Sequence, residues 1–476
     1  MVMLLEDIVE SVELWLKLIR KKPQPYVDPD LDPVLLVPGI AGSILKAVDD
    51  KGREERVWVR ILSADYKCRT KLWSLFDPST GKTVSLDPKS NISVPEDRDG
   101  LYAIDILDPD LVIGRDCVYY FHDMIIEMIK WGFQEGKTLF GFGYDFRQSN
   151  RCQDTLQLLA AKMETVFTAS GGKKLTIITH SMGGLLVKCF MSLHSDIFEK
   201  YVKSWIAIAA PFQGAPGYVT STFVNGMSFV EGWEQNFFIS KWSMHQLVKY
   251  DGVDIPLPFN LEILKWANET RKVLSSAKLP PQVKFYNVYG TNLETPHSVC
   301  YGSEGAPVTD LQQLPSLLAN YVCVDGDGTV PVESAKVDGL NAEARVGIPG
   351  EHRGILCDRH LFRILKHWLD AGDPDPFYNP LNDYVILPTL FEIERHQEKG
   401  FQVTSLKEEW EIIGEDQDDQ ETGAADRKPL VSSIFVSNVG DEKSMREEAR
   451  ATVIVHPLGE GRQHVELNAV SVTANV

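Results

Sequence analysis

A serine followed by two glycines stands where a strand-like segment of this sequence gives way to a helix-like one. The apolar, β-branched run 175–179 ends two residues before Ser181, and Gly183 and Gly184 precede a helical pattern. A serine at such a sharp strand-to-helix turn lies on a strained backbone and exposes its hydroxyl as a nucleophile. The glycines leave room for a substrate carbonyl, and the Met182 amide at the helix N-terminus can stabilise an oxyanion.

Thr179 departs from the common G-x-S-x-G pattern, because it stands where that pattern has its first glycine. A serine beside glycines after a strand can also be an ordinary turn, so the pattern needs partners. A serine hydroxyl becomes a nucleophile when a histidine takes its proton, and an acidic residue must hold the tautomer of that histidine.

Both partners follow later in the chain, in the order acid and then histidine. The segment 325–328 is an acidic turn with two glycines, and the strand-like run 344–348 leads to Glu351 and His352. Each piece has an ordinary interpretation, since an acidic turn is often only a turn and a loop histidine is usually solvated. Three pieces in the required order, each after a strand-like run, predict a Ser–Asp–His triad.

Size and pattern predict one large α/β domain. At 476 residues the chain can bury a large core. Strand-like runs alternate with helical ones, which indicates a mostly parallel sheet with helices on both faces. The runs are 34–37, 139–142, 175–179, 204–209 and 283–289.

The charge excludes some classes of partner. A formal net charge of −19 argues against nucleic acid, because phosphate binding needs a basic surface. It also argues against strong electrostatic attachment to anionic lipid, so membrane contact should rest on apolar and aromatic side chains. No apolar run reaches the ~18 to 20 residues of a transmembrane helix.

Six segments in combination resemble the lecithin:cholesterol acyltransferase family over roughly residues 30 to 370. They are the serine, acid and histidine motifs, the first strand with its oxyanion loop, a Y-D-[WF]-R segment and an A-P-[WF]-x-G turn, at 179–184, 326–331, 351–356, 34–43, 144–147 and 209–214. The resemblance is greatest to the plant cytosolic, phospholipase-like branch. It implies an α/β-hydrolase fold with lid and cap insertions and no cofactor or metal.

The resemblance also implies roles for single residues. Ser181 would be the acyl-ester nucleophile, Asp327 the orienting acid and His352 the general base. The backbone amides of Ile40 and Met182 would form the oxyanion hole.

Two of these roles have competitors nearby. Asp325 lies two residues from Asp327, but Asp327 occupies the register of the family's G-D-x-T-V motif. His360 could replace His352, yet the apolar spacing that follows it is helical, which predicts a residue near a helix start. We therefore expect Asp327 and His352 to act.

Around the catalytic core we expect four further segments. Residues 1–24 form an amphipathic helix, packed on the domain or touching a lipid monolayer, because apolar residues recur there at helical spacing. The acidic residues among them argue against a secretory signal. Within the hydrolase domain, 25–400, aromatic residues concentrate in a lid at about 53–100 and a cap at about 215–280. A single aromatic residue is more often part of the hydrophobic core, but so many of them in these two segments favour a lipid-binding cleft. The tail 401–476 is acidic and partly disordered, with terminal strands that pair with the domain or with a partner.

Relative to plant members of the family the cap is shortened near residue 250. We expect a serine-dependent phospholipase A that releases fatty acid and lysophospholipid, with O-acyl transfer possible through an acyl-enzyme. One alternative is a sterol or glyceride O-acyltransferase that uses phospholipid as donor. Another is a catalytically silent lipid-binding protein with an altered cap.

The cysteines predict the compartment. Seven are scattered without C-x-x-C pairs, and we expect buried thiols, for example at Cys189 and Cys323. Secreted relatives close the lid with a disulfide, whereas the matching segment here contains only Cys68. A cytoplasmic protein follows, not secreted, with transient peripheral contact to endomembranes that supply its glycerophospholipid substrate.

Overall fold

The computed structural model describes most of the hydrolase domain and parts of the tail. The expected helix at 1–24 and most of the expected cap lie outside the described residues, and of the shortened stretch near residue 250 only 249–250 and 253–254 are described. The described residues are 26–60, 66–111, 115–217, 249–250, 253–254, 261–303, 306–307, 319–372, 401–413, 430–438, 447–459 and 462–474.

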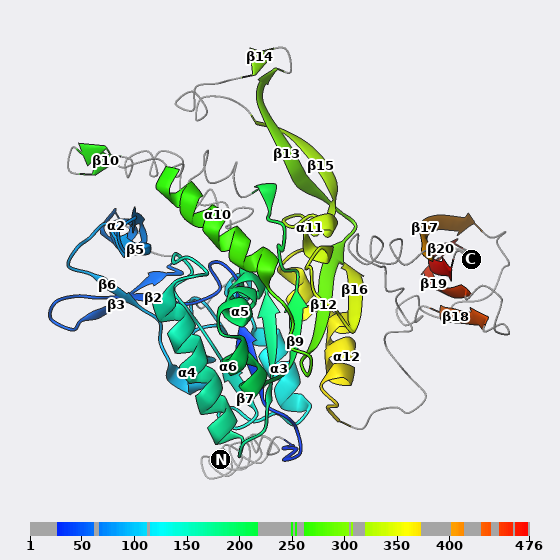
Figure 1. The fold of residues 1–476 in the computed structure, drawn as a ribbon, viewed down its shortest axis with the longest axis horizontal. Coiled ribbons are helices and arrows are strands. Elements are labelled where there is room, and N and C mark those ends of the chain that lie inside the picture. The colour runs from blue at the N-terminus through cyan, green and yellow to red at the C-terminus, as the bar shows by residue number, and fades with distance from the viewer. Residues whose placement is uncertain are drawn as a thin grey trace, which may run out of the picture.

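A six-stranded sheet forms the centre of the protein (Figure 1). Its order is β16-β12-β9-β8-β1-β7, and every neighbouring pair is parallel. The predicted α/β-hydrolase fold is therefore confirmed. The strands are β1 (Val34–Val37), β7 (Leu139–Gly141), β8 (Leu175–His180), β9 (Val202–Ile208), β12 (Lys284–Thr291) and β16 (Ala344–Pro349).

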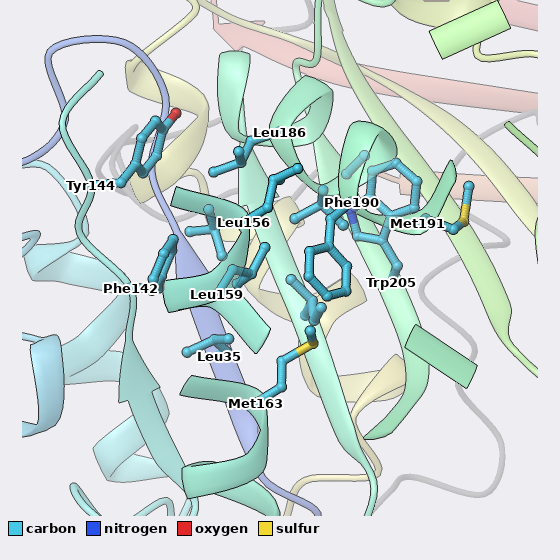
Figure 2. Packing of buried hydrophobic residues seen from close by; sticks show 14 of the residues in the cluster. Leu35, Phe142, Tyr144, Leu156, Leu159, Met163, Leu186, Phe190, Met191 and Trp205 are labelled. Carbon is cyan, nitrogen blue, oxygen red and sulfur yellow. The ribbon is translucent and has the colours of Figure 1, made fainter. Parts of the chain in front are cut away.

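Helices cover both faces of this sheet, because the central strands are apolar on both sides. In β1, Val34 and Leu36 face one core cluster and Leu35 and Val37 face the other. The first cluster includes α3 (His122–Lys130) and α12 (Arg359–Trp368). The second includes α4 (Gln153–Ala169), α5 (Met182–Leu193) and α6 (Ser195–Tyr201). Figure 2 shows Leu35 and Trp205 among the side chains of this second cluster.

Two small antiparallel sheets are formed by the expected lid together with the strand just before it. One has the order β3-β2-β6, and the other is the hairpin β4–β5. The elements of this region are β2 (Leu45–Val48), β3 (Glu54–Trp58), α2 (Tyr66–Leu72), β4 (Ser74–Asp77), β5 (Lys82–Ser85), β6 (Asn91–Ser93) and the short 3-10 helices η1 (Asp97–Gly100) and η2 (Arg115–Val118).

Trp266 connects the hairpin β4–β5 to the rest of the protein. It lies on α10 (Leu261–Ser276), and its ring packs edge-on against Phe76 with 6.0 Å between centroids. The Arg151 guanidinium lies 4.1 Å from the centre of the Trp266 ring, and the indole N–H donates to Ser149 Oγ at 2.8 Å. Gly81 is at φ +69°, and a Cβ there would come within 2.1 Å of the tryptophan ring. The hairpin and α10 are thus fitted to each other.

An antiparallel arm departs from the central sheet after β12. Strand β13 (Leu293–Ser303) pairs with β15 (Ala319–Gly326) and, at its far end, with β14 (Ala306–Pro307), and Figure 1 shows these strands projecting away from the sheet. The acidic turn 325–328 therefore begins within the last residues of an arm strand, β15. Cys189 is buried as predicted, but the prediction for Cys323 is wrong, because β15 exposes it in this ribbon.

Strands of the tail form a sheet of their own, with the order β17-β20-β19-β18 and only antiparallel pairs. These strands are β17 (Phe401–Ile413), β18 (Leu430–Asn438), β19 (Glu447–Gly459) and β20 (Arg462–Ala474). The two predicted terminal strands fall in β19 and β20 and pair with each other. The remaining described elements are β10 (Lys249–Tyr250), β11 (Val253–Asp254), α11 (Val332–Lys336) and η4 (Gly354–Cys357).

Candidate active site

Ser181 lies at the turn between β8 and α5 on a strained backbone. Its φ of 52° and ψ of −129° are unusual for a residue with a side chain. The Ser181 N–H donates to Ile208 O at 2.9 Å, which fixes the turn to β9. A Cβ at Gly183 would come within 2.4 Å of Pro38 O, and a Cβ at Gly184 would come within 2.6 Å of Ala210 Cβ. Both glycines are therefore required by close packing at the start of α5.

Thr179 fits where the common pattern has glycine. It is fully buried, and its hydroxyl accepts a hydrogen bond from Trp205 Nε1 at 3.0 Å. Gly184 faces it across the turn, since a Cβ there would lie 3.5 Å from Thr179 Oγ1. The glycine on the helix side leaves the space that the threonine side chain needs.

The structure brings together the three side chains that the motifs single out. His352 Nε2 lies 3.0 Å from Ser181 Oγ, and His352 Nδ1 lies 2.7 Å from Asp327 Oδ2. All three residues are at least 95% buried. This is the geometry in which an imidazole, oriented by a carboxylate, can accept the proton of a serine hydroxyl.

Asp327 is held so that one carboxylate oxygen faces His352. Its Oδ1 accepts the backbone N–H groups of Thr329 at 3.0 Å and Val330 at 2.6 Å, which leaves Oδ2 for the imidazole. A Cβ at Gly290 would come within 2.4 Å of Asp327 Cβ, so β12 must have a glycine there. Asp327 follows the arm strand β15 but packs against the end of β12 in the central sheet.

The two competing residues lie elsewhere. Asp325 is exposed, and its Oδ1 accepts the N–H of Asn292 at 2.6 Å. His360 is in the first turn of α12, where its N–H donates to the capping residue Asp358 at 2.8 Å. Neither is placed to serve Ser181.

The loop after β1 is shaped to present the Ile40 amide. Gly42 N–H donates to Gly39 O at 3.2 Å, which fixes the orientation of the peptide that carries the Ile40 N–H. Ala41 is at φ 62°, and its carbonyl accepts a hydrogen bond from Trp58 Nε1 in the lid at 2.7 Å. A Cβ at Gly39 would come within 2.6 Å of Ser181 Cβ, so the loop closes directly over the serine.

The second amide of the expected oxyanion hole belongs to Met182, the first residue of α5. Among the hydrogen bonds between described residues, neither the Ile40 N–H nor the Met182 N–H has an acceptor. Two such amides beside a serine are suited to bind the oxyanion of a tetrahedral intermediate.

Two buried residues at the site were not predicted from the sequence. Tyr120 Oη lies 2.6 Å from His180 Nδ1, and His180 Nε2 lies 2.9 Å from the backbone oxygen of His352. Burial, with a smaller contribution from His352, holds the pKa of His180 well below its ordinary 6.5. The position of His180 beside Ser181 was the available signal, whereas nothing in the sequence connects Tyr120 with the site.

The described part of the chain contains no group of three or more histidine, cysteine, aspartate or glutamate side chains that could hold a metal ion. None of its described helices is long and apolar enough to cross a bilayer.

Comparison with known proteins points to one family. The model of the lecithin:cholesterol acyltransferase family matches residues 55–230. The chain is 59% identical over 539 aligned positions to "Lecithin-cholesterol acyltransferase-like 4" of Arabidopsis thaliana, covering 100% of both proteins. That alignment is longer than this chain, so some positions of the relative have no counterpart here.

Two further relatives match most of their own length. "Phospholipase A(1) LCAT3" of Arabidopsis thaliana is 44% identical, and the match covers 71% of this chain and 91% of the relative. "Lysosomal phospholipase A and acyltransferase" of Bos taurus is 24% identical, with the same two shares.

Proposed function

Because the chain belongs to the lecithin:cholesterol acyltransferase family, we propose that it is a serine-dependent phospholipase A that cleaves a fatty acyl ester of a glycerophospholipid. The observation that supports this most strongly is the buried Ser181–His352–Asp327 arrangement beside two amides without an acceptor among the described residues. The names of two relatives, a phospholipase A(1) and a lysosomal phospholipase A and acyltransferase, support the same reaction class.

In the acylation half-reaction, His352 Nε2 accepts the proton of Ser181 Oγ while that oxygen attacks the acyl carbonyl carbon. The Ile40 and Met182 amides donate to the oxyanion, and Asp327 stabilises the imidazolium. The intermediate then collapses: the bond to the glycerol oxygen breaks, His352 gives its proton to that oxygen, and a lysophospholipid leaves. The acyl chain remains as an ester on Ser181.

The acyl-enzyme can then pass its acyl group to either of two kinds of acceptor. Water, deprotonated by His352, gives free fatty acid and restores the serine. A sterol or glyceride hydroxyl in the same place gives a new ester, and the word acyltransferase in two relatives' names favours testing for it. We propose hydrolysis as the main reaction because LCAT3, at 44% identity, is named a phospholipase.

Phosphatidylcholine with different chains at sn-1 and sn-2, presented with and without a sterol, tests this function. We expect free fatty acid and lysophosphatidylcholine, and no products from Ser181→Ala. Ser204→Ala, which removes a buried hydroxyl from β9, is the matched control and should retain activity. More acyl sterol than free fatty acid would instead assign transfer as the main reaction.

A silent lipid-binding protein with an altered cap is the alternative from another class. Such a protein would sediment with phosphatidylcholine vesicles and release neither product. The filled triad and both amides favour the enzyme.

We further propose that the protein acts in the cytoplasm and contacts membranes transiently through apolar side chains. The cysteines with described side chains form no disulfide, which is consistent with a reducing compartment. Deleting residues 1–24 and measuring sedimentation with vesicles tests the membrane role of that segment, and unchanged sedimentation would remove it.

A further inference from the structure

The peptide between Pro38 and Gly39 is held at both ends by buried tyrosines. Gly39 N–H donates to Tyr120 Oη at 2.8 Å, and Tyr144 O–H donates to Pro38 O at 3.1 Å. Tyr120 and Tyr144 are 8% and 4% exposed. The peptide directly before the one that carries the Ile40 N–H therefore has little freedom to rotate.

Tyr120 also contacts His180, and the chemistry of the groups sets the direction of each hydrogen bond. The backbone oxygen of His352 can only accept, so His180 Nε2 carries the proton of that 2.9 Å bond. In neutral His180 the other ring nitrogen, Nδ1, is then an acceptor. Tyr120 must donate to it at 2.6 Å, and its oxygen accepts from Gly39. A continuous chain of donors thus runs from the oxyanion loop to the loop of the general base.

The surroundings of His180 keep it neutral. It is 1% exposed, and burial lowers its pKa well below 6.5. The electrostatic effects of the His352 ring and of Arg353 lower this pKa further, whereas the hydrogen bond to the backbone oxygen of His352 raises it; burial is the largest effect and the net shift is downward. The rings of His180 and His352 are 4.8 Å apart between centroids, so a cationic His180 would repel the imidazolium that forms on His352.

His352 is held at its backbone as well as at its ring. Its N–H donates to Asp327 O at 2.9 Å, its carbonyl accepts from His180, and its Nδ1 pairs with Asp327 Oδ2. Only Nε2 then remains, facing Ser181.

We propose that His180 and Tyr120 are positioning residues that fix the oxyanion loop and the general base beside Ser181 as one hydrogen-bonded unit. The proposal rests on the proposed esterase chemistry and adds to it two residues that need not touch substrate. Removing a link should misplace the reacting groups while leaving substrate binding unchanged.

The test measures hydrolysis of a soluble p-nitrophenyl ester together with the melting temperature. We expect Tyr120→Phe, which keeps the ring, to lower kcat by about ten- to a hundred-fold with KM within about twofold, because a misplacement of about 1 Å can cost about a hundred-fold. The matched control is Thr176→Val. It removes another buried hydrogen bond of β8, to Ser204 Oγ at 2.7 Å, and should retain kcat even if it melts earlier.

Two conservative replacements of His180 distinguish its hydrogen bond to His352 O from its hydrogen bond to Tyr120. A glutamine places an N–H near the position of Nε2 and can still donate to His352 O, whereas an asparagine reaches only the position of Nδ1. We expect His180→Gln to retain higher kcat than His180→Asn at similar melting temperatures. The double variant Tyr120→Phe/His180→Gln should lose less than the product of the single losses, as expected for residues of one unit.

The inference would be overturned if Tyr120→Phe kept kcat within about twofold of the wild type. It would also be overturned if Thr176→Val lost as much kcat as Tyr120→Phe, because the loss would then follow from general destabilisation. If His180 variants do not fold, Tyr120→Phe with its control decides alone. A folded wild type that hydrolyses neither the soluble ester nor phosphatidylcholine would refute the proposed function, which is a different result from active enzyme with insensitive variants.

Discussion

Replacing Asp327 by asparagine should disable the site through the tautomer of His352. The backbone N–H groups of Thr329 and Val330 donate to Oδ1. In the variant the asparagine carbonyl oxygen must take that place, because the asparagine NH2 group cannot accept these hydrogen bonds. Its NH2 group then occupies the position of Oδ2, 2.7 Å from His352 Nδ1, and donates to it. His352 must consequently carry its proton on Nε2, where it cannot accept the proton of Ser181.

The expected size of this effect is large. A wrong histidine tautomer lowers kcat by about 10⁴-fold in a serine protease triad, which corresponds to about 5.5 kcal/mol of transition-state stabilisation. The substitution keeps the shape of the side chain, so we expect a melting temperature close to that of the wild type. The assay is kcat for a soluble p-nitrophenyl ester, with the melting temperature measured on the same samples.

Asp325→Asn is the matched control. Asp325 is exposed and accepts one backbone N–H, from Asn292, which an asparagine carbonyl can also do. We expect its kcat to stay within about threefold of the wild type, since exposed substitutions away from the reacting atoms have small effects. The reasoning fails if Asp327→Asn retains more than about a tenth of wild-type kcat in folded protein, or if Asp325→Asn loses as much.

Three further predictions concern stability and the lid. Burial lowers the pKa of His180 in the folded protein, so between that pKa and 6.5 the unfolded chain binds more protons than the folded protein. The contribution of neutral His180 to the free energy of unfolding is therefore complete above about pH 6.5 and is lost as pH falls. In urea unfolding between pH 7 and pH 5, His180→Gln should flatten this loss by up to about 1.4 kcal/mol per pH unit, and parallel curves would contradict it. Gly183→Ala should destabilise the protein by about 1 to 3 kcal/mol, because its Cβ would lie 2.4 Å from Pro38 O, and wild-type stability would show that α5 can shift. Trp266→Ala should speed hydrogen exchange in the hairpin β4–β5, whereas Trp266→Phe, which keeps a ring against Phe76, should speed it less; equal rates in both variants would mean that the ring does not hold the hairpin.

The central sheet could be predicted from the sequence because its strands are buried on both faces. Every residue in runs such as 34–37 and 175–179 is either apolar or β-branched, and the structure has strands at both. Boundaries were less accurate where the pattern is mixed: β9 begins at Val202, although Lys203 is exposed and the predicted run began at residue 204.

The residues of the candidate site could be predicted as far as local motifs carry them. Ser181 and His352 follow β8 and β16, so the parallel sheet itself brings their loops to the same edge. The preference for Asp327 over Asp325 rested on motif register. The structure gives the physical reason. Two backbone N–H groups bind Asp327 Oδ1, and the absence of a side chain at Gly290 leaves space for Asp327.

Contacts between distant segments could not be predicted. Tyr120 and His180 are 60 residues apart, and a buried tyrosine in a loop looks like any core aromatic until the fold places it. The arm β13–β15 was missed for a similar reason, since its valines resemble those of a buried strand, yet Val322 is 61% exposed. The separate sheet of β17–β20 depends on pairings along the tail that alternation alone does not specify.

The central claim is that Ser181 is a nucleophile activated by the folded site. Reaction of the folded protein with a fluorophosphonate, followed by peptide mass mapping, tests it directly. We predict one covalent adduct, on the peptide that contains Ser181, and none when the protein is denatured before the probe is added. An adduct on another residue, or no adduct on the folded protein, would contradict the claim.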